Sequence, residues 1–466
     1  MNQLKKALRE SKTARWGVLL LISYVMAANY YFYDALSPLK STLQEQLHFS
    51  SEDYGWVQGF YAFPNTFLLM AILGGIILDK IGIRITGMIF VVFMVIGAFV
   101  TAYGTTTYYG NGGWGYEFMG SFLPKFSPQV KMMAFGMLLF GLGAETSIVV
   151  ISKTIVKWFK GKEIALAFGV NLGIARIGTA LSILIGPKLL VPDWTKPVWL
   201  AVVLLLIALL AFLVYLVIDV KLDKQIGQEK LMTKEDEFHL KDFIAIITNR
   251  SFIFIAALCV TFYAAVFPFL KYATDFFHYK FNVPLDTASF IAFWLPMGTV
   301  AFTPIFGALI DKIGKGALFM IFGSLMLTIV HLLFAFTTIN AYVLVAFLGI
   351  AFSLVPSAMW PSVAKIVSVN KIGTAYGTMF SLQNLGLFVV PIVAGLILDS
   401  TNPGVTPEDL KNGAVLNYTP TMLMFACFGL LGMIFAFLLK KEDKTSGYGL
   451  DLPSNATVQD SPTEKI

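Results

Sequence analysis

The stretch GIILDKIGIR at residues 75–84 returns late in the chain as GALIDKIGK at residues 307–315. The letters D-K-I-G are identical in the two copies, and each copy follows a long apolar run. Internal repeats of this kind are typical of membrane proteins built from two equivalent halves. The pair therefore predicts two similar units, one in each half of the chain.

The composition around these repeats predicts an integral membrane protein. Hydrophobic residues make up 57% of the 466 residues and charged residues 13%, with a mean hydropathy of +0.74. Soluble domains contain about 45–50% apolar and about 25% charged residues. A helix of about 20 apolar residues can cross a bilayer. We expect twelve such spans, at 17–36, 54–78, 85–104, 132–156, 164–186, 198–219, 251–274, 287–310, 317–336, 341–364, 374–398 and 419–439.

Basic residues are distributed unevenly between the predicted loops. With the N-terminus in the cytoplasm, 25 of 34 Lys and Arg fall on the cytoplasmic side, eight on the other side and one, Arg176, within a span. This is the positive-inside pattern, so we expect both termini in the cytoplasm. The basic start could also belong to a cleaved signal peptide, but removal of the first span would destroy the asymmetry. The net charge of +6 thus reports topology, and no nucleic-acid partner is expected.

A polar segment separates the two apolar blocks. Its later part, about 234–247, has apolar residues at helical spacing, and we favour a solvated linker helix over one lying on the membrane surface. The end of the chain is polar and rich in Ser, Thr and Asp, so we expect it to be disordered. The predicted division is a cytoplasmic N-terminus at 1–16, a six-helix bundle at 17–219, a cytoplasmic linker at 220–250, a second six-helix bundle at 251–440 and a cytoplasmic tail at 441–466.

Two opposite charges are predicted at one depth in the first bundle. Counted from the turn near residue 160, Glu145 is 15 residues away and Arg176 is 16. At about 1.5 Å per residue, both lie roughly 15 to 20 Å into a hydrocarbon layer about 30 Å thick. Such charges are costly, so they form a structural ion pair or bind the two ends of a zwitterion. Glu145 can bind an ammonium group, and Arg176 can hold a carboxylate bidentately.

The fifth and eleventh spans share a weaker correspondence. Seven residues beyond the aligned Gly169 and Gly377 stand Arg176 and Asn384, so one site is charged in one half and polar in the other. This asymmetry suits a ligand with a fixed orientation. Aromatic residues can form the flat walls of such a site, although helix packing is the alternative. The candidate ligand-binding residues are Glu145, Arg176, Asn384, Tyr263, Tyr61 and Asn171.

The sequence offers no pattern for catalysis or metal binding. Cys259 and Cys427 lie within predicted spans, which supports neither a disulfide framework nor a thiol metal site. The histidines show no ligand spacing such as H-E-x-x-H. We therefore expect no enzyme, no catalytic residue, no metal and no cofactor.

The repeated stretch resembles the loop signature of the major facilitator superfamily. Gly75 permits close helix contact and Gly82 a tight turn, while an acid at one helix end can pair with a base across the loop. Breaking and making such pairs biases which face of a transporter is open. The resemblance therefore implies a conformational latch, which consists of Gly75, Asp79, Lys80, Gly82, Arg84, Asp311 and Lys312.

A closer resemblance covers about residues 15–440. It is to the lysosomal dipeptide transporter branch of that superfamily, and it implies an all-α membrane fold of twelve helices in two six-helix bundles. It also implies that Glu145 and Arg176 hold the two termini of a dipeptide. The runs that carry it are FGLGAET at 140–146, WFKGKE at 158–163, ARIG at 175–178, AVFPF at 265–269, GTAYG at 373–377, QNLGL at 383–387 and AGLILDS at 394–400.

The resemblance implies further properties that this sequence does not all match. The family member is a uniporter of cationic dipeptides that works with an accessory subunit and carries an acidic dileucine sorting signal. Residues 1–15 show no such signal, so we expect a cell membrane location, no accessory subunit and a monomer.

We thus expect an alternating-access transporter of small solutes, with dipeptides moved by uniport or with protons. One alternative is a proton-coupled transporter of another organic anion or zwitterion. The alternative from another class is a non-transporting membrane sensor or scaffold, against which the short polar tail argues.

Overall fold

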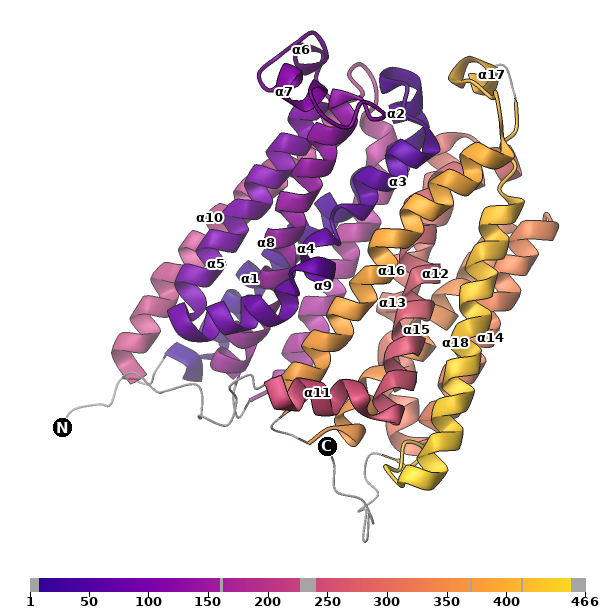
Figure 1. Cartoon of the computed structure of the whole chain (residues 1–466). Coiled ribbons are helices and arrows are strands. Elements are labelled where there is room, and N and C mark those ends of the chain that lie inside the picture. The colour runs from indigo at the N-terminus through magenta and orange to yellow at the C-terminus, as the bar shows by residue number, and fades with distance from the viewer. Residues whose placement is uncertain (1–7, 160–161, 227–239, 369–370, 412–413, 454–466) are drawn as a thin grey trace.

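The computed structural model describes residues 8–159, 162–226, 240–368, 371–411 and 414–453, and all regular structure within them is helical (Figure 1). The predicted all-α membrane fold is confirmed. The long helices are α1 (Lys12–Asp34), α5 (Met70–Gly104), α8 (Pro128–Phe159), α9 (Ile164–Ile185), α10 (Lys196–Ile226), α12 (Arg250–Phe281), α13 (Leu285–Ile313), α14 (Gly316–Phe336), α15 (Ala341–Ile366), α16 (Ile372–Thr401) and α18 (Thr419–Ser446). The shorter ones are η1 (Leu8–Glu10), η2 (Ser37–Leu39), α2 (Lys40–Leu47), α3 (Ser51–Gly59), α4 (Phe63–Phe67), α6 (Thr107–Gly110), α7 (Tyr116–Gly120), η3 (Gly186–Leu189), α11 (Leu240–Thr248) and α17 (Pro407–Lys411).

Eleven helices of the described chain are long and apolar enough to cross a membrane, and they coincide with eleven of the predicted spans. The remaining span, predicted at 54–78, is broken. It consists of α3, α4 and the first turns of α5, with Leu69 in the left-handed conformation at φ 51° between α4 and α5. Helix α5 then continues through the next predicted span, 85–104. It has a kink at Gly82, whose φ is 82° and ψ is 166°.

The helices form two groups, which we call the N-half (α1–α10) and the C-half (α12–α18). In the N-half α5 packs on α8 and α1 on α9, and in the C-half α14 packs on α18 and α13 on α15. The halves meet where α3 lies along α16 and α9 along α13 (Figure 1). We call the end with α2, α6, α7 and α17 the upper end, and the end with α11 the lower end, as drawn in Figure 1.

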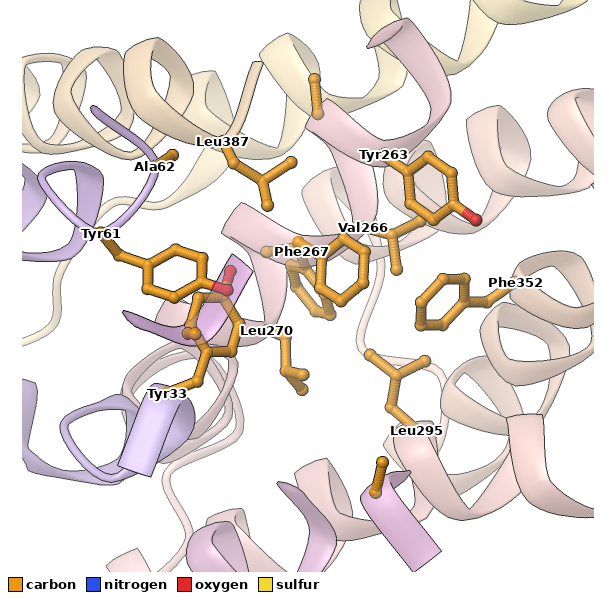
Figure 2. Close-up of a cluster of buried hydrophobic side chains, with 14 of the residues drawn as sticks. Tyr33, Tyr61, Ala62, Tyr263, Val266, Phe267, Leu270, Leu295, Phe352 and Leu387 are labelled. Atoms are coloured by element: carbon orange, nitrogen blue, oxygen red, sulfur yellow. The ribbon is translucent and has the colours of Figure 1, made fainter. Parts of the chain in front are cut away.

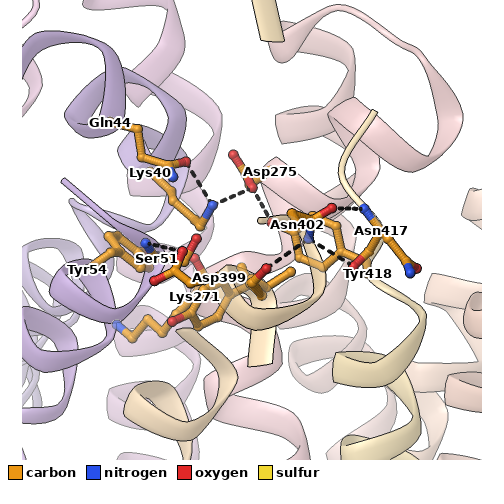
Figure 3. A network of polar contacts seen from close by, with 12 residues as sticks. Lys40, Gln44, Ser51, Tyr54, Lys271, Asp275, Asp399, Asn402, Asn417 and Tyr418 are labelled. Atoms are coloured by element: carbon orange, nitrogen blue, oxygen red, sulfur yellow. Dashed lines mark hydrogen bonds and ion pairs between the residues drawn. The ribbon is translucent and has the colours of Figure 1, made fainter. Parts of the chain in front are cut away.

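Two buried ion pairs join the halves at the upper end, and Figure 3 shows the one between Lys40 and Asp275. Lys40 of α2 binds Asp275 of α12 at 3.0 Å, and Lys271 of α12 binds Asp34 of α1 at 2.8 Å. The side chains of both pairs are at most 2% exposed. Each half therefore supplies one acid and one base to these contacts, which we call the upper closure. Tyr418 also donates a hydrogen bond to Asp275.

A helix end adds to this closure. The Asp399 carboxylate, at the upper end of α16, accepts hydrogen bonds from the backbone N–H groups of Ser51 at 2.9 Å and Glu52 at 2.7 Å. These groups begin α3 and have no partner within their helix. A negative charge there also interacts favourably with the helix dipole. The halves approach so closely here that a Cβ on Gly395 would lie 2.1 Å from the Ser51 carbonyl oxygen.

The linker and the tail differ in part from expectation. Residues 227–239 and 454–466 lie outside the described chain. Helix α11 falls within the predicted linker helix and packs on α12 and α16. The tail was expected to be disordered from residue 441, yet α18 continues to Ser446 and Leu450 is 1% exposed. Asp451 explains the order: its backbone and side-chain oxygens accept from the N–H groups of Lys315 (2.8 Å) and Ala317 (3.1 Å) at the start of α14.

Candidate functional site

Glu145 lies on α8 and is 8% exposed. Its carboxylate accepts hydrogen bonds from the Tyr61 hydroxyl at 2.8 Å and from Asn65 Nδ2 at 3.1 Å. Tyr61 precedes α4 and Asn65 lies within it, so the broken second span supplies both donors. Buried carboxylates need such partners because desolvation of an ionised group is costly.

Arg176 lies on α9 with its guanidinium among three aromatic rings. The guanidinium carbon is 5.3 Å from the centre of Tyr30, 5.3 Å from Phe267 and 5.4 Å from Phe352. Tyr30 belongs to the N-half and the other two to the C-half, so the charge lies at the interface. Cation–π contacts stabilise the charge but leave its N–H donors unused. No residue in the described part of the chain accepts a hydrogen bond from Arg176.

A small cavity lies between the halves beside Glu145. Its volume is about 60 Å³, enough for a few water molecules and below the roughly 300 to 1,000 Å³ of sites that hold drug-sized ligands. Figure 2 shows four of its lining residues, Tyr33, Tyr61, Phe267 and Leu387, converging from the two halves. The others are Asn29, Tyr30, Glu145, Ile148, Phe380, Gln383 and Asn384.

Two polar atoms of this lining have no hydrogen-bond partner among the described residues. Asn384 donates to the Phe380 carbonyl of its own helix at 2.9 Å, but its Oδ1 is buried and unpaired within that part of the chain, as is Nδ2 of Asn29. Buried polar atoms are nearly always satisfied by protein or ordered water. These two atoms are therefore suited to bind water or a polar ligand within the cavity.

The two predicted charges do not pair with each other. Within the described chain Glu145 is bound by Tyr61 and Asn65, whereas Arg176 lies against rings. The structural ion pair considered from the sequence is thus not what the structure shows. Tyr30 connects the two sites, because its ring lines the cavity beside Glu145 and also lies under the guanidinium.

The other predicted site residues are placed unequally. Tyr263 is one ring away from the Arg176 site: it stacks on Phe267 with centres 5.4 Å apart, and its hydroxyl accepts from Trp360 Nε1 at 3.0 Å. Asn171 does not line this cavity. Its Oδ1 accepts from the Ser23 hydroxyl at 3.0 Å, which joins α9 to α1 away from the cavity lining. Its polarity serves helix packing in this structure.

Some residues of the site are not among the candidates drawn from the sequence. Asn65 is the most important, since it is fully buried and binds Glu145 directly. Tyr30 and Tyr33 also line the cavity. The four-residue spacing of Tyr61 and Asn65 was the available signal, but the break in the helix that aims both at Glu145 was not predicted.

Arg84, one of the predicted latch residues, binds Asp219 of α10 at 2.9 Å and Asp223 beside it. Lys157 of α8 completes the cluster, at 2.8 Å from Asp219 and 2.7 Å from Asp223. The cluster thus joins three helices of the N-half at the lower end.

The remaining latch positions are less informative. The side chain of Asp79 lies outside the described residues. A Cβ on Gly75 would meet no described atom within 4 Å, so close helix contact does not explain this glycine, whereas Gly82 has the positive φ of a turn. Lys80, Asp311 and Lys312 are exposed at the lower helix ends.

The comparison with known proteins agrees with this architecture. The sequence matches the Major Facilitator Superfamily over residues 20–292 and 264–455. The chain belongs to the Major Facilitator Superfamily. It is therefore a multi-pass membrane transporter and not an enzyme.

Among curated relatives of this superfamily member is the lysosomal dipeptide transporter MFSD1. The protein of Homo sapiens is 32% identical over 398 residues, which cover 82% of this chain and 80% of the relative. That of Mus musculus is 31% identical over 400 residues, covering 83% and 80%. The predicted resemblance to this branch is confirmed.

Solved structures of the superfamily show the same fold. The nucleoside transporter NupG has a TM-score of 0.66 at 17% identity, covering 92% of this chain and 99% of that one. The xylose transporter XylE from E. coli, in an inward-open conformation, has a TM-score of 0.65 at 15% identity, covering 91% and 96%. A bacterial homologue of the human lysosomal transporter Spinster also scores 0.65, at 15% identity and coverage of 92% and 98%.

Proposed function

We propose that this transporter moves dipeptides by alternating access, with the peptide ammonium at Glu145 and the carboxylate at Arg176. The observation that carries the proposal is that these opposite charges lie at the interface of the halves and do not neutralise each other. Arg176 has free donors for a carboxylate, which it can hold bidentately. Tyr30 lies between them and separates the two poles. The MFSD1 relatives, named as dipeptide transporters, support the same substrate class.

The cavity is too small for a dipeptide in the present state, so binding requires the halves to move apart. The buried pairs Lys40–Asp275 and Lys271–Asp34 close the upper end. Exchange of the substrate at that end requires both pairs and the Asp399 contacts with α3 to break. This agrees with a rocking motion of one half against the other around a central site.

The basic residues gather at the lower end, so we place that end and both termini in the cytoplasm. The upper end then faces the exterior or the lumen of an organelle. We retain the cell membrane as the proposed location, while the relatives are named lysosomal. Localisation of a tagged protein, together with the accessibility of labels at each end, tests both assignments.

A proton-coupled transporter of an organic anion is the second candidate. The separation of the charges favours it, because Arg176 alone could hold the anion while Glu145 carries a proton. Uptake driven by a pH gradient and not inhibited by dipeptides would decide for this candidate.

End-modified peptides test the assignment of the two poles. An N-acetyl dipeptide lacks the ammonium and a C-amidated dipeptide lacks the carboxylate. Each charge-assisted hydrogen bond contributes about 1.5–3 kcal/mol, so removal of either ligand end should weaken binding by roughly 10- to 100-fold. In Glu145→Gln the penalty for acetylation should disappear, and in Arg176→Gln that for amidation.

Exposed residues provide matched controls for these variants. Glu408→Gln and Arg250→Gln make the same chemical changes at exposed positions, so both penalties should remain. Binding is measured by thermal shift of the purified protein and transport by uptake into proteoliposomes. Equal penalties in wild type and in both site variants would overturn the assignment.

A further inference from the structure

Asn65 is connected to three parts of the site at once. Its Nδ2 donates to Glu145 at 3.1 Å, and its Oδ1 accepts from the backbone N–H of Ala71 at 2.9 Å and from the Ser381 hydroxyl at 3.2 Å. These partners belong to α8, to the first turn of α5 and to α16 of the C-half. The Asn65 side chain is fully buried. One amide therefore links the proposed ammonium site to the broken span and to the opposite half.

The contact with Ala71 matters because it lies across the break in the second span. Helix α5 begins after Leu69, and the cap residue provides no side-chain hydrogen bond. The first N–H groups of a helix need an acceptor, and in a membrane an unsatisfied group is costly. The Oδ1 of Asn65 supplies this acceptor from the preceding helix. The bend between α4 and α5 thus depends on the orientation of one amide.

A cation at Glu145 would disturb this orientation. An ammonium group makes stronger hydrogen bonds to a carboxylate than a neutral amide does, so it competes with Nδ2 of Asn65. If the amide turns over to find another partner, its NH₂ group faces the N–H of Ala71, and donor then meets donor. If it stays, Nδ2 is buried without an acceptor. Either outcome raises the free energy of the present arrangement relative to one in which the second span has moved.

We propose that Asn65 is a positioning residue that couples the charge state and occupancy of Glu145 to the bend between α4 and α5 and to the contact of this segment with α16. Its ligand arm rests on the proposed function, because the cation is taken to be the ammonium of a dipeptide. The test without ligand does not rest on it, because Glu145→Gln itself removes the negative charge to which Asn65 donates its hydrogen bond.

The ligand-free test is a double-mutant cycle between Glu145→Gln and Asn65→Leu. Spin labels at the exposed lower-end positions Lys224 of the N-half and Lys441 of the C-half report the distance between the halves. Cys427 is replaced by Ser because it is exposed. We expect Glu145→Gln to change the ratio of the distance populations by about fivefold or more in the wild-type background and by less than about twofold with Asn65→Leu, as for residues in direct contact.

Milder variants separate coupling from folding. Ser381→Ala removes only the contact with the C-half, and we expect it to keep dipeptide affinity within about threefold while changing the transport rate by about fivefold or more. Thr66→Val is the matched control, since its hydroxyl lies on the same short helix and has no hydrogen-bond partner in the described part of the chain. It should behave as wild type in every measurement.

The outcomes distinguish this inference from the proposed function. If dipeptides do not bind the wild type, the proposed function fails, and the ligand-free cycle alone decides the role of Asn65. If dipeptides bind and shift the distances equally in wild type, Asn65→Leu and Ser381→Ala, the coupling role is overturned. Equal effects of Glu145→Gln with and without Asn65 overturn it as well.

Discussion

Replacement of Lys271 by Met should open the upper end. Lys271 binds Asp34 at 2.8 Å, and both side chains are at most 2% exposed. Without the lysine, Asp34 keeps the Thr179 hydroxyl at 2.7 Å but loses its counter-charge. Breaking a buried pair on one side costs about 3–5 kcal/mol, because the remaining charge is uncompensated. The cost applies only while Asp34 is buried, so it is relieved when water enters at the upper end.

The equilibrium should therefore move strongly towards states open at the upper end. At 1.4 kcal/mol per factor of ten, a cost of 3–5 kcal/mol changes the population ratio roughly a hundredfold to several thousandfold. Spin labels at Lys196 of α10 and Asp286 of α13, both exposed near the upper end, measure the separation of the halves. The longer distance should dominate in Lys271→Met and be minor in the wild type.

Two further variants make this reasoning refutable. In the double variant Asp34→Asn with Lys271→Met no buried charge remains, so the closed state should largely return. Lys280→Met is the control, because Lys280 donates to the Ala335 carbonyl within the C-half and does not join the halves. If Lys271→Met lowers the unfolding temperature but leaves the distances unchanged, the pair stabilises the fold without holding the closure.

Three other predictions concern parts of the chain outside the site. Arg84→Met should lower the unfolding free energy by about 1–3 kcal/mol in thermal denaturation, because Asp219 is 1% exposed and loses one of its cationic partners. Lys221→Met, at an exposed position of α10, the helix that carries Asp219, should have little effect. Leu69→Gly should raise the unfolding free energy by up to about 1–2 kcal/mol, since glycine adopts the observed φ of 51° without strain. A lower unfolding free energy would show that the contacts of the leucine side chain outweigh this strain. Asp451→Ala should detach residues 447–453 and speed their amide hydrogen exchange, because a helix cap typically contributes about 0.5–2 kcal/mol to stability. Unchanged exchange in these residues would contradict the capping role.

Hydropathy was sufficient to predict the spans but not the details that build the site. Eleven spans follow from long apolar runs, whereas the break at Leu69 depends on contacts with other helices, among them Asn65 with Ala71. Counting residues along two helices predicts a common depth for Glu145 and Arg176. It does not predict their separate surroundings, because the rings around Arg176 come partly from the C-half.

Pairs between the halves were equally hidden from the sequence. Nothing near Asp34 in the sequence indicates Lys271 as its partner. The residues are 237 positions apart, and only the docking of α1 against α12 brings them together. For the same reason the loop signature identified the family correctly but did not indicate Asp219 and Asp223 as partners of Arg84.

The closure and the proposed substrate site are in direct contact through two tyrosines. Lys271 lies 3.3 Å from the centre of the Tyr33 ring, and this ring packs on Tyr61 with centres 4.3 Å apart. The Tyr61 hydroxyl in turn binds Glu145. A ligand that displaces Tyr61 from the carboxylate therefore moves a ring that touches the ring beneath the upper ion pair. Glu145 thus contacts Tyr61, which leads to the upper closure, and Asn65, which leads to the broken span, so its occupancy can act on both.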